Sequence, residues 1–397
     1  MDSLIVIVTL CLTLSLFFSE LCYRLGYPRI LGPMITGIFL GFQPFKDFIE
    51  PFTEQISFLS ELAIVFLLLL AGLEINIRKL QKTSKDAVLI AFFSALIPFV
   101  LGFSITKLLY SFGILTTLAD QSNIVAAVVG ACLSLTAEGT SLAMLIEMKA
   151  LNTRVGALVL GAGILDDVFE ITFLSALLVF VSNSRSMIEL PILVFMFVVC
   201  IILIWKVVPG LIKFIQKEDS RITTVSTIIV ITLIIASLSS LFGLSPIIGA
   251  FIGGLIIQVS NKDKEDERMD IEELKTLSFS LIVPFFFINI GLNFDVASIF
   301  AHPLVVFVIV IAGFASKLIG SIIVTPITSL TLKQTYLIGW AMNSRGAMEL
   351  VILELARQNN LVTPEVYSAV VVMAILTTLV FPIMFSRIVK KDKSILN

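Results

Sequence analysis

Three acidic residues inside an apolar run are the groups in this chain best suited to do chemistry. Asp166 and Asp167 are adjacent, and Glu170 follows one helical turn later, within the run 154–183. The run is long enough to cross a bilayer, where each acid costs roughly 2.5 to 3.5 kcal/mol on insertion scales. A purely structural role for two adjacent acids is disfavoured, since one lysine neutralises only one of them. The pattern therefore predicts a site for a cation or for protons.

The composition excludes a soluble globular protein. Hydrophobic residues make up 58 % of the chain, charged residues 14 %, and the mean hydropathy is +1.06, whereas soluble domains have about 45 to 50 % and about 25 %. Four cysteines without CxxC spacing and the single His302 predict neither a disulfide scaffold nor a transition-metal site. We expect an all-α polytopic membrane protein without a cofactor and without a nucleic-acid partner.

Apolar runs separated by polar clusters predict thirteen membrane spans. They lie at roughly 4–22, 30–45, 56–74, 87–106, 122–148, 155–183, 188–212, 222–242, 244–260, 276–292, 298–327, 334–355 and 365–386. Of the 27 Lys and Arg residues, 20 lie in loops after odd-numbered spans or in the tail, and four lie in loops after even-numbered spans. Because cytoplasmic loops collect basic residues, the N-terminus is predicted outside and the C-terminus in the cytoplasm. We expect the first run to be a retained span, and no nucleotide-binding domain after Lys390.

An internal repeat relates the two halves of the chain. Residues 31–41 match residues 244–254, and residues 66–76 match residues 285–295. The match pairs spans 1 to 6 with spans 8 to 13 and leaves span 7 as a linker helix. An odd displacement of seven spans gives the copies opposite orientations, which is typical of secondary transporters.

Two spans at corresponding places in the repeat are interrupted by polar and small residues. The interruptions are Ser134–Ser141 in span 5 and Asn343–Glu349 in span 12. Broken helices that cross near the midplane would expose carbonyls and helix ends beside Asp166 and Asp167. With Thr136, these carboxylates offer oxygen ligands without imidazole or thiolate, which favours a monovalent cation over a transition metal.

Basic residues inside the spans need counter-charges. Lys317 in span 11 is the only lysine deep in the second repeat, and the two aspartates are its candidate partners. Arg345 and Glu349 are four residues apart and are expected mainly to satisfy each other. Glu138 could be a partner of Arg345 or a further ion ligand. The predicted ion- and proton-binding residues are Asp167, Asp166, Thr136 and Ser134, and the supporting or possible ligands are Glu138, Glu170, Asn343, Arg345 and Glu349.

Taken together, these residues resemble the second family of the monovalent cation:proton antiporter superfamily, which contains sodium/proton exchangers and potassium-efflux transporters. The similarity covers nearly the whole chain. Its marks are Leu25–Gly32, Ala71–Glu74, Ser134–Thr136, Asp166–Asp167, Gly243–Gly254, Pro284–Phe287, Lys317, Arg345–Gly346 and Glu349. The resemblance implies that Asp167 is the ion- and proton-binding carboxylate, that Asp166 pairs with Lys317, and that Na+ is held by Asp167, Asp166 and Thr136.

The resemblance also implies an organisation. Segments 1–86 and 222–297 would form a panel that dimerises, 87–183 and 298–397 a mobile core, and 184–221 the linker helix. The expected protein is a homodimer in the cell membrane whose core moves like an elevator. Glu138 and Glu170 depart from the family pattern and could alter ion choice, stoichiometry or pH dependence.

The paired aspartates and the lysine look like the electrogenic sodium/proton branch, with Li+ accepted as well. K+/H+ exchange or potassium efflux in the same family is the alternative. An intramembrane aspartyl protease is remote, because Gly163-Ile-Leu-Asp166 stands where a GxGD motif would be required. A passive channel is disfavoured by the inverted repeat.

Overall fold

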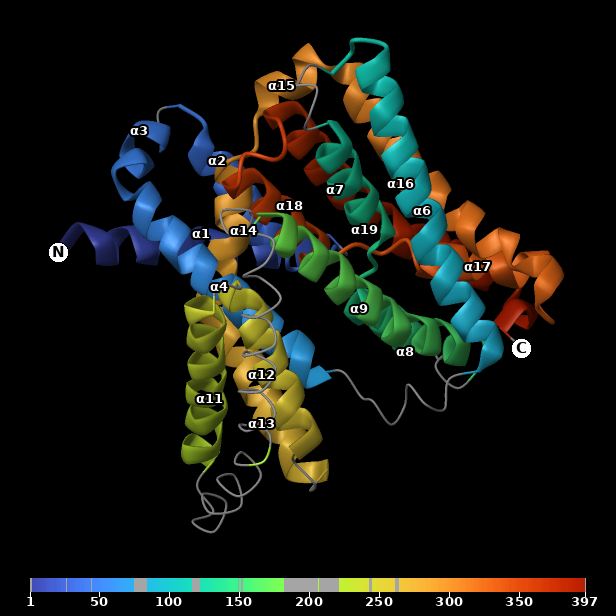
Figure 1. The fold of residues 1–397 in the computed structure, drawn as a ribbon, viewed down its shortest axis with the longest axis horizontal. Coiled ribbons are helices and arrows are strands. Elements are labelled where there is room, and N and C mark those ends of the chain that lie inside the picture. The colour runs from blue at the N-terminus through green and yellow to red at the C-terminus, as the bar shows by residue number, and fades with distance from the viewer. Residues whose placement is uncertain are drawn as a thin grey trace. The chain divides into compact units, whose positions relative to one another are not determined.

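A computed structural model of the chain describes residues 2–25, 27–43, 45–74, 84–115, 122–148, 150, 153–181, 206, 221–242, 245–260 and 264–396. In these ranges all regular structure is helical, without a strand (Figure 1). The predicted all-α class agrees with this. Predicted span 7, at 188–212, lies outside the described residues apart from Lys206.

Seven helices in the described part of the chain are long and apolar enough to cross a bilayer. They are Leu4–Arg24, Phe45–Glu74, Lys85–Ser111, Thr223–Leu241, Ile271–Leu292, Pro303–Ile327 and Pro364–Lys391. Four shorter apolar helices accompany them, at Leu31–Gly41, Ser122–Ser134, Arg154–Gly163 and Pro246–Val259. The structure thus supports a polytopic membrane protein, while the count of thirteen spans and the inverted repeat stay predictions.

The chain divides into two compact units. The first unit comprises Met1–Ile77 and Leu178–Asn293, and the second comprises Arg78–Leu177 and Phe294–Asn397. The panel and core roles predicted for similar segments stay predictions.

The first unit is built from helices that approach closely at glycines. Its elements are α1 (Asp2–Arg24), α2 (Leu31–Gly41), α3 (Phe45–Ile49), η1 (Glu50–Phe52), α4 (Thr53–Glu74), α11 (Arg221–Leu241), α12 (Pro246–Ser260), α13 (Lys264–Leu277), the π-helical η3 (Ser278–Ile282) and α14 (Val283–Leu292). A Cβ added at Gly37 of α2 would lie 2.8 Å from the Cα of Gly291 in α14. A Cβ added at Gly72 of α4 would lie 3.1 Å from the Cα of Gly254 in α12. Small residues at such crossings let membrane helices pack backbone to backbone.

The second unit contains the residues that the sequence marks as chemically important. Its elements are α6 (Lys85–Ser111), α7 (Ser122–Ser134), α8 (Glu138–Glu147), α9 (Arg154–Val181, to residue 177), α15 (Val296–Ala301), α16 (Pro303–Ile323), η4 (Thr325–Ile327), α17 (Leu332–Ala341), α18 (Ala347–Gln358), α19 (Pro364–Lys391) and η5 (Lys393–Leu396). Helices α6 and α16 run side by side along much of their length (Figure 1). The Ser84 hydroxyl caps α6 by accepting a hydrogen bond from the Ala87 N–H, and a capping box of Thr331 and Gln334 starts α17.

Candidate ion-binding site

Span 5 is interrupted where the sequence predicted it. Helix α7 ends at Ser134, residues 135–137 are not helical, and α8 begins at Glu138. Ala137 has φ −84° and ψ 100°, an extended conformation that turns the chain out of the helix. The interruption leaves the last carbonyls of α7 and the first N–H groups of α8 without partners in their own helices.

Span 12 is interrupted in the same way between α17, which ends at Ala341, and α18, which begins at Ala347. The buried Glu349 carboxylate accepts the backbone N–H of Gly346 at 3.0 Å from each oxygen. A carboxylate in the first turn also suits the positive end of the helix dipole. Glu349 therefore caps α18.

The two interruptions satisfy each other's backbone. The Ala137 N–H donates to the Ser344 carbonyl at 2.9 Å, and the Ser344 hydroxyl donates back to the Ala137 carbonyl at 2.6 Å. The Thr136 hydroxyl donates to the Met342 carbonyl at 3.1 Å. A Cβ on Gly346 would lie only 2.5 Å from the Ala137 Cβ, so glycine permits this approach.

The Lys317 ammonium from α16 reaches the interruption of span 5. It donates to the Thr136 hydroxyl at 2.6 Å and to the Ser134 carbonyl, and it lies 3.5 Å from a carboxylate oxygen of Asp166 on α9. Both charged side chains are 0 % exposed. The expected contact between Lys317 and Asp166 is therefore present, while the transport roles of both residues stay predictions.

The Arg345 guanidinium lies against the end of α7. Its nitrogens donate to the carbonyls of Cys132 at 3.2 Å, Leu133 at 2.8 Å and Leu135. These carbonyls carry the negative end of the α7 dipole, so a buried cation stabilises them. These hydrogen bonds of Arg345, like those of Glu349 to the Gly346 N–H, go to backbone groups at a helix break, while the expected pairing of Arg345 with Glu349 stays a prediction.

The remaining candidate ligands fall into two groups. The Asn343 amide nitrogen donates to the Phe314 carbonyl at 3.0 Å, and the Ser134 hydroxyl donates to the Ala95 carbonyl at 2.9 Å. The side chains of Asp167, Glu170 and Glu138 lie outside the part of the chain that the structure describes, although their backbones are helical.

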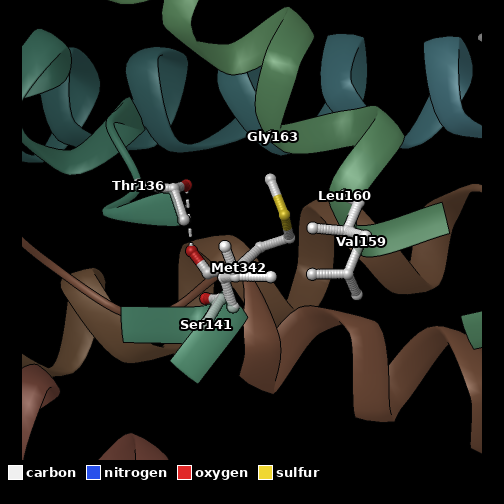
Figure 2. Close-up of a pocket in the computed structure, with 7 residues that line it drawn as sticks. Thr136, Ser141, Val159, Leu160, Gly163 and Met342 are labelled. Atoms are coloured by element: carbon white, nitrogen blue, oxygen red, sulfur yellow. Dashed lines mark hydrogen bonds between the residues drawn. The ribbon is translucent and has the colours of Figure 1, made fainter. Parts of the chain in front are cut away.

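A small cavity lies beside the paired interruptions. Figure 2 shows Thr136, Ser141 and Met342 on one side, facing Val159, Leu160 and Gly163 of α9. Its volume of about 10 Å³ is at the lower limit for one water molecule. Gly163, which lines the cavity, precedes Asp166 on α9 by about one helical turn.

Three residues of this arrangement were not among the predicted ligands. The Ser141 hydroxyl donates to the Ala341 carbonyl at 2.6 Å and lies 3.0 Å from the Ser344 hydroxyl. Both serines belong to the polar runs that mark the interruptions, which was the available signal. Met342 lines the cavity, and no sequence pattern pointed to it.

The chain is similar to known transporters over nearly its whole length. The family described as "Sodium/hydrogen exchanger, transmembrane" matches residues 6–391. A Na(+)/H(+) antiporter of Enterococcus hirae is 30 % identical over 391 residues, covering 97 % of this chain and 98 % of the relative. The Na(+)/H(+)-K(+) antiporter GerN of Bacillus cereus is 28 % identical over 366 residues, covering 92 % and 90 %.

Among solved structures, the sodium proton antiporter MjNhaP1 from Methanocaldococcus jannaschii at pH 8 has the same fold, with a TM-score of 0.69 at 15 % identity over 96 % of this chain and 95 % of that one. The interrupted helices, the buried ion pair between them and the full-length sequence match lead to one assignment. The chain is a polytopic membrane protein that belongs to the transmembrane sodium/hydrogen exchanger family of cation/proton antiporters.

Proposed function

We propose that this protein exchanges Na+ or Li+ for H+ by alternating access, with the cation and protons competing for Asp167 and Asp166. The observation that carries the proposal is the buried contact between Lys317 and Asp166 beside Thr136, where two interrupted helices meet. A fully buried pair of opposite charges contributes little to stability, because the desolvation of the two groups offsets much of their attraction. Such a pair in a membrane span suits a site where the carboxylate exchanges the ammonium for a transported cation.

The charge balance gives the expected stoichiometry. In the proton-loaded state the Lys317 ammonium faces the Asp166 carboxylate, and Asp167 is protonated. When Na+ binds both carboxylates, Asp167 releases its proton, and Lys317 gives up a proton from nitrogen and keeps the electron pair. One Na+ thus replaces two protons, so each cycle moves one net charge and transport is electrogenic.

The ligands for the cation would be oxygens. Carboxylates, the Thr136 hydroxyl and carbonyls freed by the interruptions can replace the water shell of a hard monovalent ion. The Thr136 hydroxyl now lies between the ammonium and the Met342 carbonyl. Departure of the ammonium would free this oxygen for the ion, and the cavity along Val159 and Gly163 offers an approach.

K+/H+ exchange is the second candidate function. The name of the Bacillus cereus relative includes K+ as well as Na+. The side chains of Glu138 and Glu170 could tune this choice, since a further acid near the site changes the number of charged ligands.

The remaining parts of the proposal concern organisation. Helices α6 to α9 and α15 to α19 carry the site residues, which supports assigning 87–183 and 298–397 as the moving core. Segments 1–86 and 222–297 would form the panel of a homodimer, joined by the linker 184–221. The distribution of Lys and Arg supports a place in the cell membrane with the N-terminus outside and the C-terminus in the cytoplasm.

The decisive experiment is ion-driven dequenching of a pH-sensitive dye in sealed proteoliposomes with an imposed proton gradient. Na+ and Li+ should each restore fluorescence, and a membrane potential should change the rate because the exchange moves charge. A response to K+ alone would replace the proposal by its alternative.

Asp167→Asn tests the site itself. The variant should reach the membrane and unfold at nearly the wild-type temperature, but it should show no exchange because the amide cannot exchange a proton for a cation. Exchange by this variant at the wild-type rate would move the binding site elsewhere.

A further inference from the structure

Two buried hydroxyls near the site have no hydrogen-bond partner. Ser94 on α6 and Ser321 on α16 are both 0 % exposed, and the Oγ of each is unbonded. Most buried side-chain polar atoms in proteins are hydrogen-bonded, and an internal water molecule is a common partner for those that no protein group satisfies. These two hydroxyls are therefore candidates for binding such a water.

The two serines lie at the same crossing of helices. A Cβ added at Gly320, the neighbour of Ser321, would lie 3.2 Å from the Cα of Ser94. On the other side, a Cβ added at Gly339 of α17 would lie 3.2 Å from the Cβ of Ser321. The glycines bring α6, α16 and α17 close together at Ser321, and Ser94 lies at the same crossing.

The position of Ser321 connects this crossing to Lys317. Lys317 and Ser321 are four residues apart on α16, which places them on one face with about 5 to 6 Å between their Cβ atoms. Thr325 follows four residues later, at the start of η4 just beyond the end of α16. Thr325 is partly exposed, and its hydroxyl lies 2.8 Å from that of Thr335. The polar residues therefore run from the buried ammonium to the partly exposed Thr325, whose hydroxyl lies beside that of the buried Thr335.

We propose that Ser94 and Ser321 hold a water molecule that relays protons between Lys317 and the hydroxyl pair of Thr325 and Thr335. Protons would then travel along α16, while the cation would use the cavity lined by Thr136 and Met342. The inference rests on the proposed proton exchange at Lys317 and adds a route to it.

The relay conserves protons and electron pairs at each step. An N–H bond of Lys317 breaks, the electron pair stays on nitrogen, and the proton joins the water oxygen. The water passes one of its own protons to the Thr325 oxygen, and the Thr325 hydroxyl proton moves on to solvent, because Thr325 is partly exposed whereas Thr335 is fully buried. The Thr325 hydroxyl otherwise donates to the Ile322 carbonyl at 2.7 Å, so a rotation of the hydroxyl resets the chain.

The double variant Ser94→Ala/Ser321→Ala tests the relay. Exchange in proteoliposomes should fall about tenfold, the scale expected from losing the hydrogen bonds of one relay site. The KM for Na+ should stay at the wild-type value, and the rate ratio between H2O and D2O should rise, because proton delivery becomes limiting. Thr325→Val should act in the same direction, and Thr325→Ser should restore the rate.

Ser316→Ala is the matched control. Ser316 is also a fully buried serine on α16, but its hydroxyl donates to the Gly313 carbonyl at 3.3 Å, so the rate should not change. Wild-type exchange by the double variant would overturn the relay. A parallel loss of Na+ affinity would also overturn it, because that result indicates a structural defect.

An observation independent of transport separates this inference from the proposed function. A structure at a resolution that shows ordered water should contain a water molecule bonded to both serine hydroxyls, absent from Ser321→Ala. A dry contact between the serines would refute the relay even if Na+/H+ exchange is observed. A wild-type protein that exchanges no cation would refute the proposed function and, with it, proton delivery to Lys317.

Discussion

The two compact units of the chain differ in the interactions inside each of them. In the first unit, α2 meets α14 and α4 meets α12 at glycines whose backbones approach closely. The second unit also has close glycine contacts, at Gly102 with Gly130 and at Gly320, but in addition it buries charged groups, most of them at or beside the helix breaks. Among the described residues, all five buried charged side chains belong to this unit, namely Asp166, Lys317, Arg345, Glu349 and Glu354.

We expect this difference to separate residues that stabilise the fold from residues that take part in transport. Close glycine packing has one favourable geometry, because any displacement opens a void or causes a clash. A buried polar network specifies one arrangement while every group has its partner, but a change in protonation or ion occupancy removes a partner and can favour another arrangement. The second unit is therefore expected to hold the groups that change partners.

Lys317→Met should give the largest effect. The substitution leaves the Asp166 carboxylate buried without its ammonium, which typically costs about 3 to 5 kcal/mol. Adding Asp166→Asn removes the stranded charge, so the double variant should unfold at a temperature closer to wild type while remaining unable to move charge. Thermal unfolding in detergent measures the stability. A single variant as stable as wild type would show that the pair is not the charged contact described for the second unit.

Gly72→Ala should destabilise the first unit through steric overlap. The added methyl group would meet the backbone of α12 near Phe251 and Gly254, and overpacking of this kind costs about 1 to 3 kcal/mol. Exchange per folded molecule should stay at the wild-type level. Gly41→Ala is the matched control, since its Cβ would lie no closer than 3.7 Å to a neighbouring atom. Equal unfolding temperatures for the two variants would contradict the proposed role of the close approach.

Gly346→Ala applies the same change to the second unit and should act on transport. The new methyl group would overlap the Ala137 Cβ and push the two interruptions apart, which should slow exchange about tenfold, in line with small misplacements at working sites. The compensating variant Gly346→Ala/Ala137→Gly moves the methyl group across the contact. Its exchange rate should recover, and a failure to recover would argue against the steric explanation.

Polarity in the sequence indicated where the candidate site lies. Small and polar residues stand out in an apolar span, so both interruptions were predicted at the right places. The scarcity of buried counter-charges pointed to Lys317 with the two aspartates, and only the family resemblance singled out Asp166. The cap formed by Glu349 could also have been predicted, since Glu349 follows Gly346 by three residues, the spacing at which a carboxylate accepts the N-cap N–H. The hydrogen-bond partners of Arg345 could not be predicted, because they are backbone carbonyls, which every residue has and which no sequence pattern indicates. The glycine contacts depend on where helices cross, which residue spacing alone does not specify.

One contact at the C-terminal end serves as a control for this comparison. It lies on the surface and involves neither close glycine packing nor a buried charge. Hydrogen bonds from the Ser394 hydroxyl, together with the Lys333 ammonium 3.3 Å away, hold the pKa of the Asp392 carboxyl below its usual range. The turn that follows buries Ile395 and Leu396 in the apolar core of the second unit.

A lowered pKa fixes the direction of the pH dependence. The charged carboxylate contributes its full stabilisation above the unfolded-state value of about 3.9, and the contribution is lost as the pH falls through the lower folded-state value. Asp392→Asn should therefore lower the unfolding temperature slightly at pH 7, and the difference from wild type should disappear as the pH falls through the lowered folded-state pKa. Because the pair is exposed, high salt should reduce the same difference at pH 7. A difference that persists in acid would mean that the side chain acts through its hydrogen bonds to the turn and not through its charge.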